Sequence, residues 1–136
     1  MMGELSRFWR ESEKRYRLLG VKCGNCGKVY FPARDICPKC HRESIGKMKE
    51  IQLSGKGEIV SFTVVHDAPT AFTRQRPYTL AIIKLDDGPM ITGQIVDSDP
   101  GEVEIGKRVR SVFRRVSQEG DYGIIEYGYK FVLDGA

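Results

Sequence analysis

From residue 57 onward, apolar and polar positions alternate, and this pattern predicts a run of β-strands. The predicted strands are Gly57–His66, Tyr78–Leu85, Met90–Val96, Arg108–Val116 and Tyr122–Val132. Turn residues separate them, and the segment between the third and fourth strands has room for a single helical turn. Five strands in about 80 residues, with Gly at the bends, are typical of a small closed barrel of the OB type. An open five-stranded meander is the alternative.

Near the N-terminus the apolar residues follow a different spacing. Apolar side chains recur there at three- and four-residue steps among charged ones, as in Leu5, Phe8, Trp9 and Tyr16. This period predicts an amphipathic helix over residues 1–20 that ends at Gly20. The aromatic face of this helix is too large to stay in water, so we expect it to pack on its own chain or on another protein.

All four cysteines lie between these regions, in two CxxC pairs separated by ten residues: Cys23, Cys26, Cys37 and Cys40. Two such pairs predict a tetrahedral four-thiolate metal site within a ribbon of residues 21–44. Zn²⁺ is the expected metal, and the closed shell makes the site structural. Iron is the alternative, since thiolates accept both metals. Two disulfides would require an oxidising compartment, and the charged N-terminus lacks the apolar core of a secretory signal.

Length and composition restrict the class of protein. The chain has 136 residues, of which 40% are hydrophobic and 29% charged, enough for one domain with a small appendage. Its apolar stretches are far shorter than the roughly 20 residues that a membrane helix requires. We therefore expect a cytoplasmic, mostly β protein with no membrane partner. The expected divisions are an N-terminal helix (1–20), a zinc ribbon (21–44) and an OB-fold domain (45–136).

Positive charge is concentrated near the N-terminus. Residues 1–40 carry nine Lys and Arg against four Asp and Glu, whereas residues 41–136 carry thirteen against fourteen. A domain that grips a nucleic-acid backbone is usually basic itself. The near-neutral barrel therefore favours a small anionic ligand or a protein surface over a long polyanion.

The sequence holds no recognisable catalytic constellation. His41 and His66 fall in different modules, and every cysteine belongs to the metal motif. His66 and the adjacent Asp67 would point to opposite faces of a strand. We therefore expect a protein that is not an enzyme.

Two basic features remain. The loop from Asp67 to Pro77 holds Phe72, Arg74 and Arg76, and an aromatic ring beside two guanidinium groups suits a nucleotide. A solvated surface loop is the alternative. Arg108, Arg110 and Arg114 share one face of the fourth strand, where we expect ordinary surface charges.

The order of these modules resembles one family along nearly the whole chain. The resemblance is carried by CGNCGKVYFPARDICPKC, by RPYTLAIIKLDDG and by the turn IGKRV. The family is that of the rubredoxin-like zinc-ribbon plus OB-fold proteins associated with acyl-CoA enzymes. The resemblance implies a small non-catalytic subunit and makes Cys23, Cys26, Cys37 and Cys40 the metal ligands.

Compact archaeal members of that family bridge acetyl-CoA acetyltransferase, a thiolase, and 3-hydroxy-3-methylglutaryl-CoA synthase in the mevalonate pathway. The resemblance therefore implies these two enzymes as partners and the passage of acetoacetyl-CoA between them. No motif of the family identifies residues of this sequence that contact CoA. Phe72, Arg74, Arg76 and Tyr78 are candidates on chemical grounds, because CoA has an adenine ring and several phosphate charges.

Two alternatives stay open. Zinc ribbons and OB barrels both bind RNA or single-stranded DNA, although the central strands here lack a row of aromatic residues for stacking. The alternate residues Tyr127, Tyr129 and Phe131 share one face, which we expect to face the core. The other alternative is partnership with a different thiolase-like enzyme or a hydratase.

Overall fold

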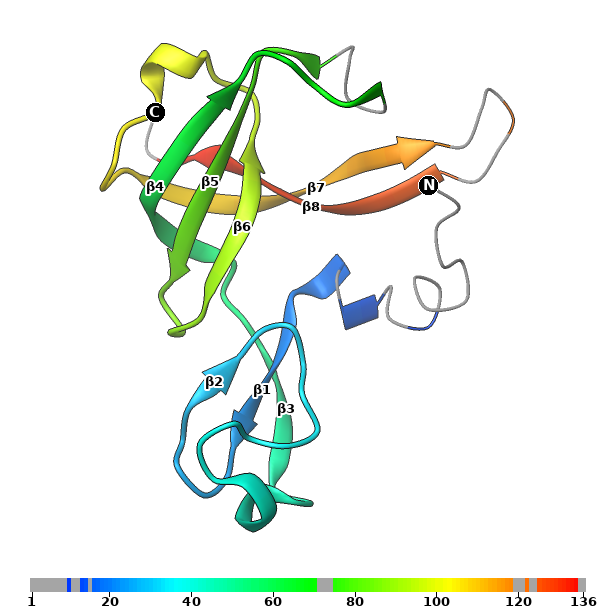
Figure 1. Ribbon diagram of the computed structural model, residues 1–136, viewed down its shortest axis with the longest axis vertical. Coiled ribbons are helices and arrows are strands. Elements are labelled where there is room, and N and C mark those ends of the chain that lie inside the picture. The colour runs from blue at the N-terminus through cyan, green and yellow to red at the C-terminus, as the bar shows by residue number, and fades with distance from the viewer. Residues whose placement is uncertain are drawn as a thin grey trace. The chain divides into compact units, whose positions relative to one another are not determined.

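The structure is a computed structural model that describes residues 10, 13–14, 16–70, 75–118, 122 and 125–134. The chain divides into two compact units, Met1–Ser54 with Asp87–Pro89 and Gly55–Asp86 with Met90–Ala136. The first unit contains a three-stranded sheet and the second a closed barrel (Figure 1).

The first unit is the expected ribbon, and its strands lie in the order β2-β1-β3. The central strand β1 (Leu19–Cys23) pairs antiparallel with β2 (Val29–Tyr30) and with β3 (Met48–Gln52). Apart from two cysteines, its buried apolar side chains are few among the described residues: Leu18, Val21 and Leu53. So small a core supplies little stability, and units of this size usually need an additional cross-link.

The helix expected over residues 1–20 is not supported over its full length, although the described residues 10, 13–14 and 16–17 are helical. Leu19 and Gly20, where that helix was expected to end, are the first two residues of β1. A Cβ at Gly20 would lie 2.7 Å from the carbonyl oxygen of Tyr30, so this glycine permits close approach of two strands. Most earlier positions of the expected helix, residues 1–9, 11–12 and 15, lie outside the described part of the chain.

The ribbon sheet also extends past residue 44, where the sequence placed its end. β3 pairs with β1 from Leu19 opposite Gln52 to Cys23 opposite Met48. Residues 48–52, which the sequence analysis assigned to the OB-fold domain, are therefore a strand of the ribbon. The burial pattern of β3 lacks regular alternation, which explains why periodicity did not identify its partner.

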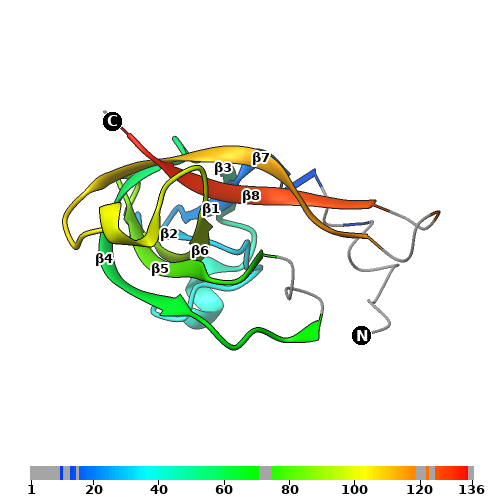
Figure 2. The same ribbon diagram turned by 90° about the horizontal axis from the view of Figure 1, so that it is seen from above.

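The second unit is a five-stranded barrel closed in the order β4-β5-β6-β8-β7, and the fold class predicted from the sequence is confirmed (Figures 1 and 2). Paired strands are antiparallel except β6 and β8, which run parallel where Ile95 lies opposite Phe131. This contact closes the barrel and excludes the open meander. The strands are β4 (Lys56–Val65), β5 (Tyr78–Leu85), β6 (Met90–Ile95), β7 (Arg108–Gln118) and β8 (Ile125–Leu133).

Alternate residues of the strands fill the barrel interior, as a period of two requires. On β5, every second residue from Thr79 to Leu85 is buried. Val109 on β7 and Phe131 on β8 are 0% exposed, and Phe131 is the largest fully buried side chain. The core therefore lies where the sequence pattern placed it, except that Tyr127, which was expected to face the core with Phe131, is 38% exposed.

Two short 3-10 helices lie between strands of the described chain. The helix η1 (His41–Ser44) follows the second cysteine pair, and η3 (Pro100–Glu102) joins β6 to β7. At η3 the Glu102 carboxylate accepts the backbone N–H of Asp99 at 3.1 Å, which completes a capping box. This is the single helical turn that the sequence allowed in the segment.

Alanine in place of Gly93 on β6 is expected to destabilise the barrel by about 1–3 kcal/mol through overpacking. Its Cβ would lie 2.5 and 2.6 Å from two ring carbons of the buried Phe131. Denaturant unfolding followed by circular dichroism measures the loss. Gly101→Ala is the matched control, since a Cβ there meets nothing within 4 Å. A Gly93→Ala protein as stable as this control would contradict the packing at the β6–β8 contact.

Candidate metal centre

Two tight turns bring the four cysteine side chains together. Cys23 ends β1, and its carbonyl accepts the N–H of Gly27 at 2.8 Å, which folds the first pair into a knuckle. The carbonyl of Cys37 accepts the N–H of His41 at 2.9 Å and forms the second. Gly27 has a φ of +76°, a conformation that favours glycine and explains that residue at the turn.

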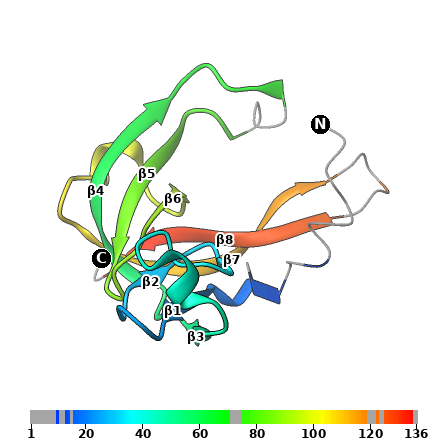
Figure 3. The same cartoon turned by 60° about the horizontal axis from the view of Figure 1, so that its bottom comes forward.

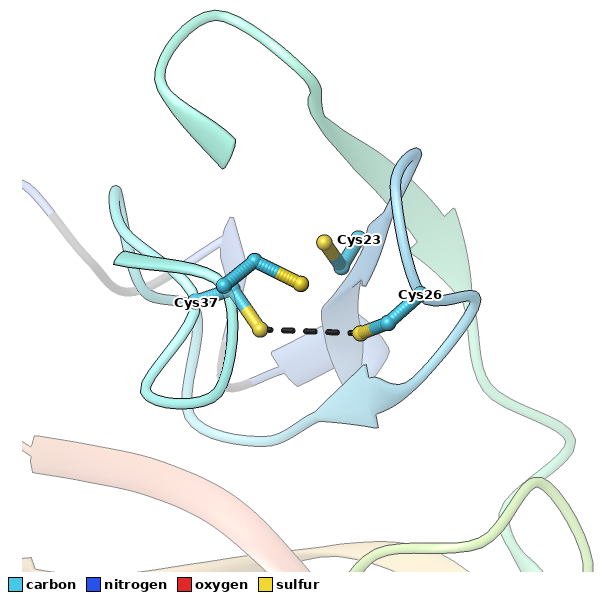
Figure 4. A group of neighbouring side chains, drawn as sticks. Cys23, Cys26 and Cys37 are labelled. Atoms are coloured by element: carbon cyan, nitrogen blue, oxygen red, sulfur yellow. Dashed lines mark hydrogen bonds between the residues drawn. The ribbon is translucent and has the colours of Figure 1, made fainter. Parts of the chain in front are cut away.

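The four Sγ atoms of Cys23, Cys26, Cys37 and Cys40 lie within 4.8 Å of one another. Sγ of Cys26 and Sγ of Cys37 lie 3.6 Å apart. Figure 4 labels these two residues and Cys23, and the side chains point toward one another. Sulfur atoms bound tetrahedrally at about 2.3 Å from zinc are separated from each other by about 3.8 Å. The cluster therefore has the dimensions and the donor atoms of a closed four-thiolate shell.

The electrostatics of the cluster oppose full ionisation of the thiols without a cation. The Tyr30 hydroxyl lies 3.3 Å from Sγ of Cys37, and its hydrogen bond helps lower the pKa of that thiol to about 6. The same hydrogen bond raises the pKa of Tyr30 to about 12. The Asn25 side chain lowers the pKa of Cys40, but burial and the other three thiols outweigh it and raise the value to about 11. A bound divalent cation would stabilise all four thiolates together, including that of Cys40, whose pKa is raised without it.

Ser44 stabilises the second knuckle through two hydrogen bonds of its hydroxyl group. Its hydroxyl accepts the backbone N–H of Cys37 at 2.8 Å and donates to the carbonyl of His41 at 2.6 Å. Ser44 is 0% exposed, whereas His41, which directly follows the last cysteine, is exposed. Neither Ser44 nor the hydroxyl of Tyr30 could be identified from the sequence, because neither residue belongs to the cysteine motif.

The candidate CoA contacts are only partly described. Phe72 and Arg74 lie outside the described residues. Arg76 is exposed, and Tyr78, the first residue of β5, is half-buried. The grouping of these four side chains therefore stays a prediction.

Ion pairs neutralise most of the positive charge on the face of β7 that carries Arg108, Arg110 and Arg114. Arg108 makes a bidentate ion pair with Asp86 at 2.8 and 2.6 Å, and its hydrogen bond lowers the pKa of that carboxyl. Arg114 pairs with Asp97 at 2.6 Å. Arg110 borders an open cavity of about 400 Å³ beside β7 and β8. With two of the three arginines paired, this face offers little free charge for a phosphate backbone.

None of the helices within the described chain is both long and apolar enough to cross a membrane.

Two family models match the chain, and each corresponds to one of the units described above. Residues 10–46 match the ChsH2 rubredoxin-like zinc ribbon domain, and residues 50–114 match the ChsH2 C-terminal OB-fold domain. The chain is similar to a DUF35 domain-containing scaffold protein of Methanocaldococcus jannaschii, with 55% identity over 92% of this chain and 87% of that protein. Its counterpart in Methanothermobacter thermautotrophicus is 48% identical over 96% of this chain and 97% of that protein.

A solved structure, the Ltp2-ChsH2(DUF35) aldolase, shares the fold with a TM-score of 0.69 at 23% identity, covering 98% of this chain and 96% of that one. More distant relatives are named as enzyme subunits. A benzoylsuccinyl-CoA thiolase subunit of Thauera aromatica is 27% identical over 84% of this chain and 74% of its own length. A probable enoyl-CoA hydratase α subunit of Thermomonospora curvata is 30% identical over 75% of this chain but 31% of its own length.

The two units and the thiolate cluster define a zinc-ribbon and OB-fold protein. The chain belongs to the family of DUF35 domain-containing scaffold proteins.

Proposed function

We propose that the chain is a non-catalytic scaffold subunit of an acyl-CoA enzyme complex. The observation that carries this proposal is 55% identity to a DUF35 scaffold protein along 87% of that relative. A thiolase subunit and a probable hydratase subunit among the more distant relatives support the class of enzyme partner. The two histidines are exposed in separate units, which fits a role without chemistry.

In the specific form of this proposal, the chain bridges acetyl-CoA acetyltransferase and hydroxymethylglutaryl-CoA synthase in the mevalonate pathway. Condensation of two acetyl-CoA molecules is thermodynamically uphill, so rapid consumption of acetoacetyl-CoA by the synthase draws it forward. A scaffold raises the local concentration of one enzyme beside the other without any new catalytic group. We place this complex in the cytoplasm, where thiolates stay reduced.

Four cysteines would hold Zn²⁺ in this proposal: Cys23, Cys26, Cys37 and Cys40. When bound, the ion cross-links the two knuckles and supplies no open coordination position. The dimensions of the sulfur cluster and the small apolar core of the ribbon support this structural role. Metal analysis distinguishes zinc from iron.

We further propose that the loop before β5 contacts CoA through Phe72, Arg74, Arg76 and Tyr78. Guanidinium groups pair with phosphates, and an aromatic ring stacks on adenine. Arg76 is exposed and so accessible to a ligand. Replacing both arginines by Gln should weaken retention on immobilised CoA, and unchanged retention would remove the loop from the proposal.

Affinity capture with the full chain tests the scaffold role. Nuclease-treated lysate of the source organism is passed over the tagged chain, and bound proteins are identified by mass spectrometry. We expect a thiolase and a hydroxymethylglutaryl-CoA synthase in fixed proportion. In a purified mixture of those two enzymes, the chain should hold them in one particle by light scattering.

Other outcomes separate the remaining possibilities. Recovery of a hydratase or another condensing enzyme alone would keep the scaffold role and replace the partners. Recovery of no acyl-CoA enzyme, together with nuclease-sensitive binding of RNA that weakens steeply with salt, would overturn the proposal.

A further inference from the structure

The hydroxyl group of Tyr30 contacts the sulfur cluster from outside the cysteine motif. It lies 3.3 Å from Sγ of Cys37. Tyr30 belongs to β2, which pairs with β1 where Val21 lies opposite Tyr30 (Figures 1 and 3). Strand β1 ends at Cys23 of the first knuckle, whereas Cys37 belongs to the second. The tyrosine therefore connects the sheet that carries the first knuckle to a sulfur atom of the second.

A bound metal ion would determine the direction of this hydrogen bond. A cysteine coordinates a metal ion as the thiolate, which has lost its proton and can only accept. The hydroxyl of Tyr30 would then be the donor to Sγ of Cys37. A hydrogen bond to an ionised acceptor is about twice as strong as one between neutral groups. The contact is therefore stronger in the metal-loaded ribbon than in the free one.

Part of the negative charge of a loaded centre would be buried. Four thiolates and one divalent ion together carry a net charge of −2. Cys23 and Cys37 are each 0% exposed, and a buried charge is costly unless it is paired or hydrogen-bonded. The Tyr30 hydroxyl provides such a bond to Cys37, and the Asn25 side chain provides one to Cys40. Both donors stabilise the charged form of the cluster.

The surrounding ribbon carries the opposite charge. Residues 16–54 contain eight Lys and Arg against three Asp and Glu. Two of these cations lie near the Tyr30 ring, with Nζ of Lys28 5.7 Å and Cζ of Arg34 5.8 Å from its centroid. Cation–π contacts of this kind help to hold the ring in place. The environment of Tyr30 therefore favours a more negative metal centre.

We propose that Tyr30 is a positioning residue of the metal centre, whose hydroxyl donates to the Cys37 thiolate and favours a divalent over a trivalent ion. With four thiolates, a divalent ion leaves the centre more negative than a trivalent ion does, so a hydrogen-bond donor stabilises the divalent form more. Hydrogen bonds to sulfur are among the features that set the reduction potential of iron–sulfur centres. This inference rests on the proposed metal site and does not depend on which enzymes the chain binds.

The first test measures metal retention by the full chain. Tyr30→Phe removes one oxygen atom and keeps the ring, and we expect it to bind Zn²⁺ about tenfold more weakly in competition with a chromophoric chelator. The matched control is Tyr127→Phe, which removes the same atom from a barrel residue that is 38% exposed. This control should keep the wild-type affinity. Circular dichroism verifies that both proteins are folded.

The second test uses the iron-substituted full chain, because one-electron reduction changes the charge of the centre and leaves its ligands unchanged. Loss of the donor in Tyr30→Phe should lower the reduction potential by about 59 mV, a tenfold loss in the preference for Fe²⁺ over Fe³⁺. A tyrosine that only fills space would not produce this shift, because phenylalanine fills the same space. An unchanged or higher potential, or an unchanged affinity for Zn²⁺, would overturn the proposal.

A labelled protein keeps the test informative if Tyr30→Phe fails to fold. Incorporation of 3-fluorotyrosine into the wild-type chain makes each phenol more acidic and hence a stronger donor. The reduction potential of the iron-substituted chain should then rise. A potential equal to that of the unlabelled chain would overturn the proposal.

The proposed metal site and this role of Tyr30 fail in different ways. If the wild-type chain binds no metal ion in fixed proportion, the metal site fails and the role of Tyr30 fails with it. If metal binding is normal and Tyr30→Phe behaves like Tyr127→Phe, only the role of Tyr30 is overturned.

Discussion

Serine in place of Cys26 is expected to abolish stoichiometric metal binding and to unfold the ribbon while the barrel stays folded. The serine hydroxyl is a poor replacement for a thiolate ligand, so the four-sulfur shell cannot close. Cys26 is the exposed member of the cluster, and its replacement disturbs packing least. Structural zinc contributes on the order of 10 kcal/mol to the folding of small domains. The few buried side chains of the ribbon cannot replace that contribution.

Three measurements check this result on the full chain. Elemental analysis should fall from one metal ion per wild-type chain to a small fraction in the variant. Limited proteolysis should cut within residues 16–54, and the β signal of the barrel should persist in circular dichroism. Lys39→Ser is the matched control, because Lys39 is an exposed residue inside the second cysteine pair. Wild-type metal content in Cys26→Ser would remove Cys26 from the ligand set.

The cysteine cluster was predictable because its information is local. Two CxxC pairs with a fixed separation restrict both turns and donor atoms, and the four sulfurs do lie within 4.8 Å of one another. The side chains that form hydrogen bonds with Cys37 of the second cysteine pair were not predictable. Folding of the intervening chain brings Ser44 and Tyr30 to Cys37. A serine or a tyrosine at these positions does not by itself indicate a metal site.

The barrel strands were predictable for a related reason. Alternation with a period of two identifies a half-buried strand without knowledge of its neighbour. Alternation did not predict where the ribbon begins and ends. Leu19 and Gly20 continue a helical spacing but pair with β3, and tertiary pairing overrides the local pattern. Periodicity also places Tyr127 on the same face as Phe131 without showing that the barrel ends between them.

Alanine in place of Phe131 is expected to destabilise the barrel by about 3–5 kcal/mol. The ring is 0% exposed, packs against Gly93 and lies where the parallel contact of β6 and β8 closes the barrel. Such a loss is a large part of the roughly 5–15 kcal/mol that stabilises an ordinary domain. Chemical denaturation followed by far-ultraviolet circular dichroism measures the change in the free energy of unfolding.

Tyr127→Ala is the control on the same face of β8, because it removes an aromatic ring that is 38% exposed. Its cost should stay near 1 kcal/mol or below. A double-mutant cycle sharpens the test, since Phe131→Leu should relieve part of the clash created by Gly93→Ala. The two losses should therefore sum to more than the loss in the double variant. Equal costs for the two alanine variants, or strict additivity in the cycle, would mean that Phe131 does not close the barrel core against β6.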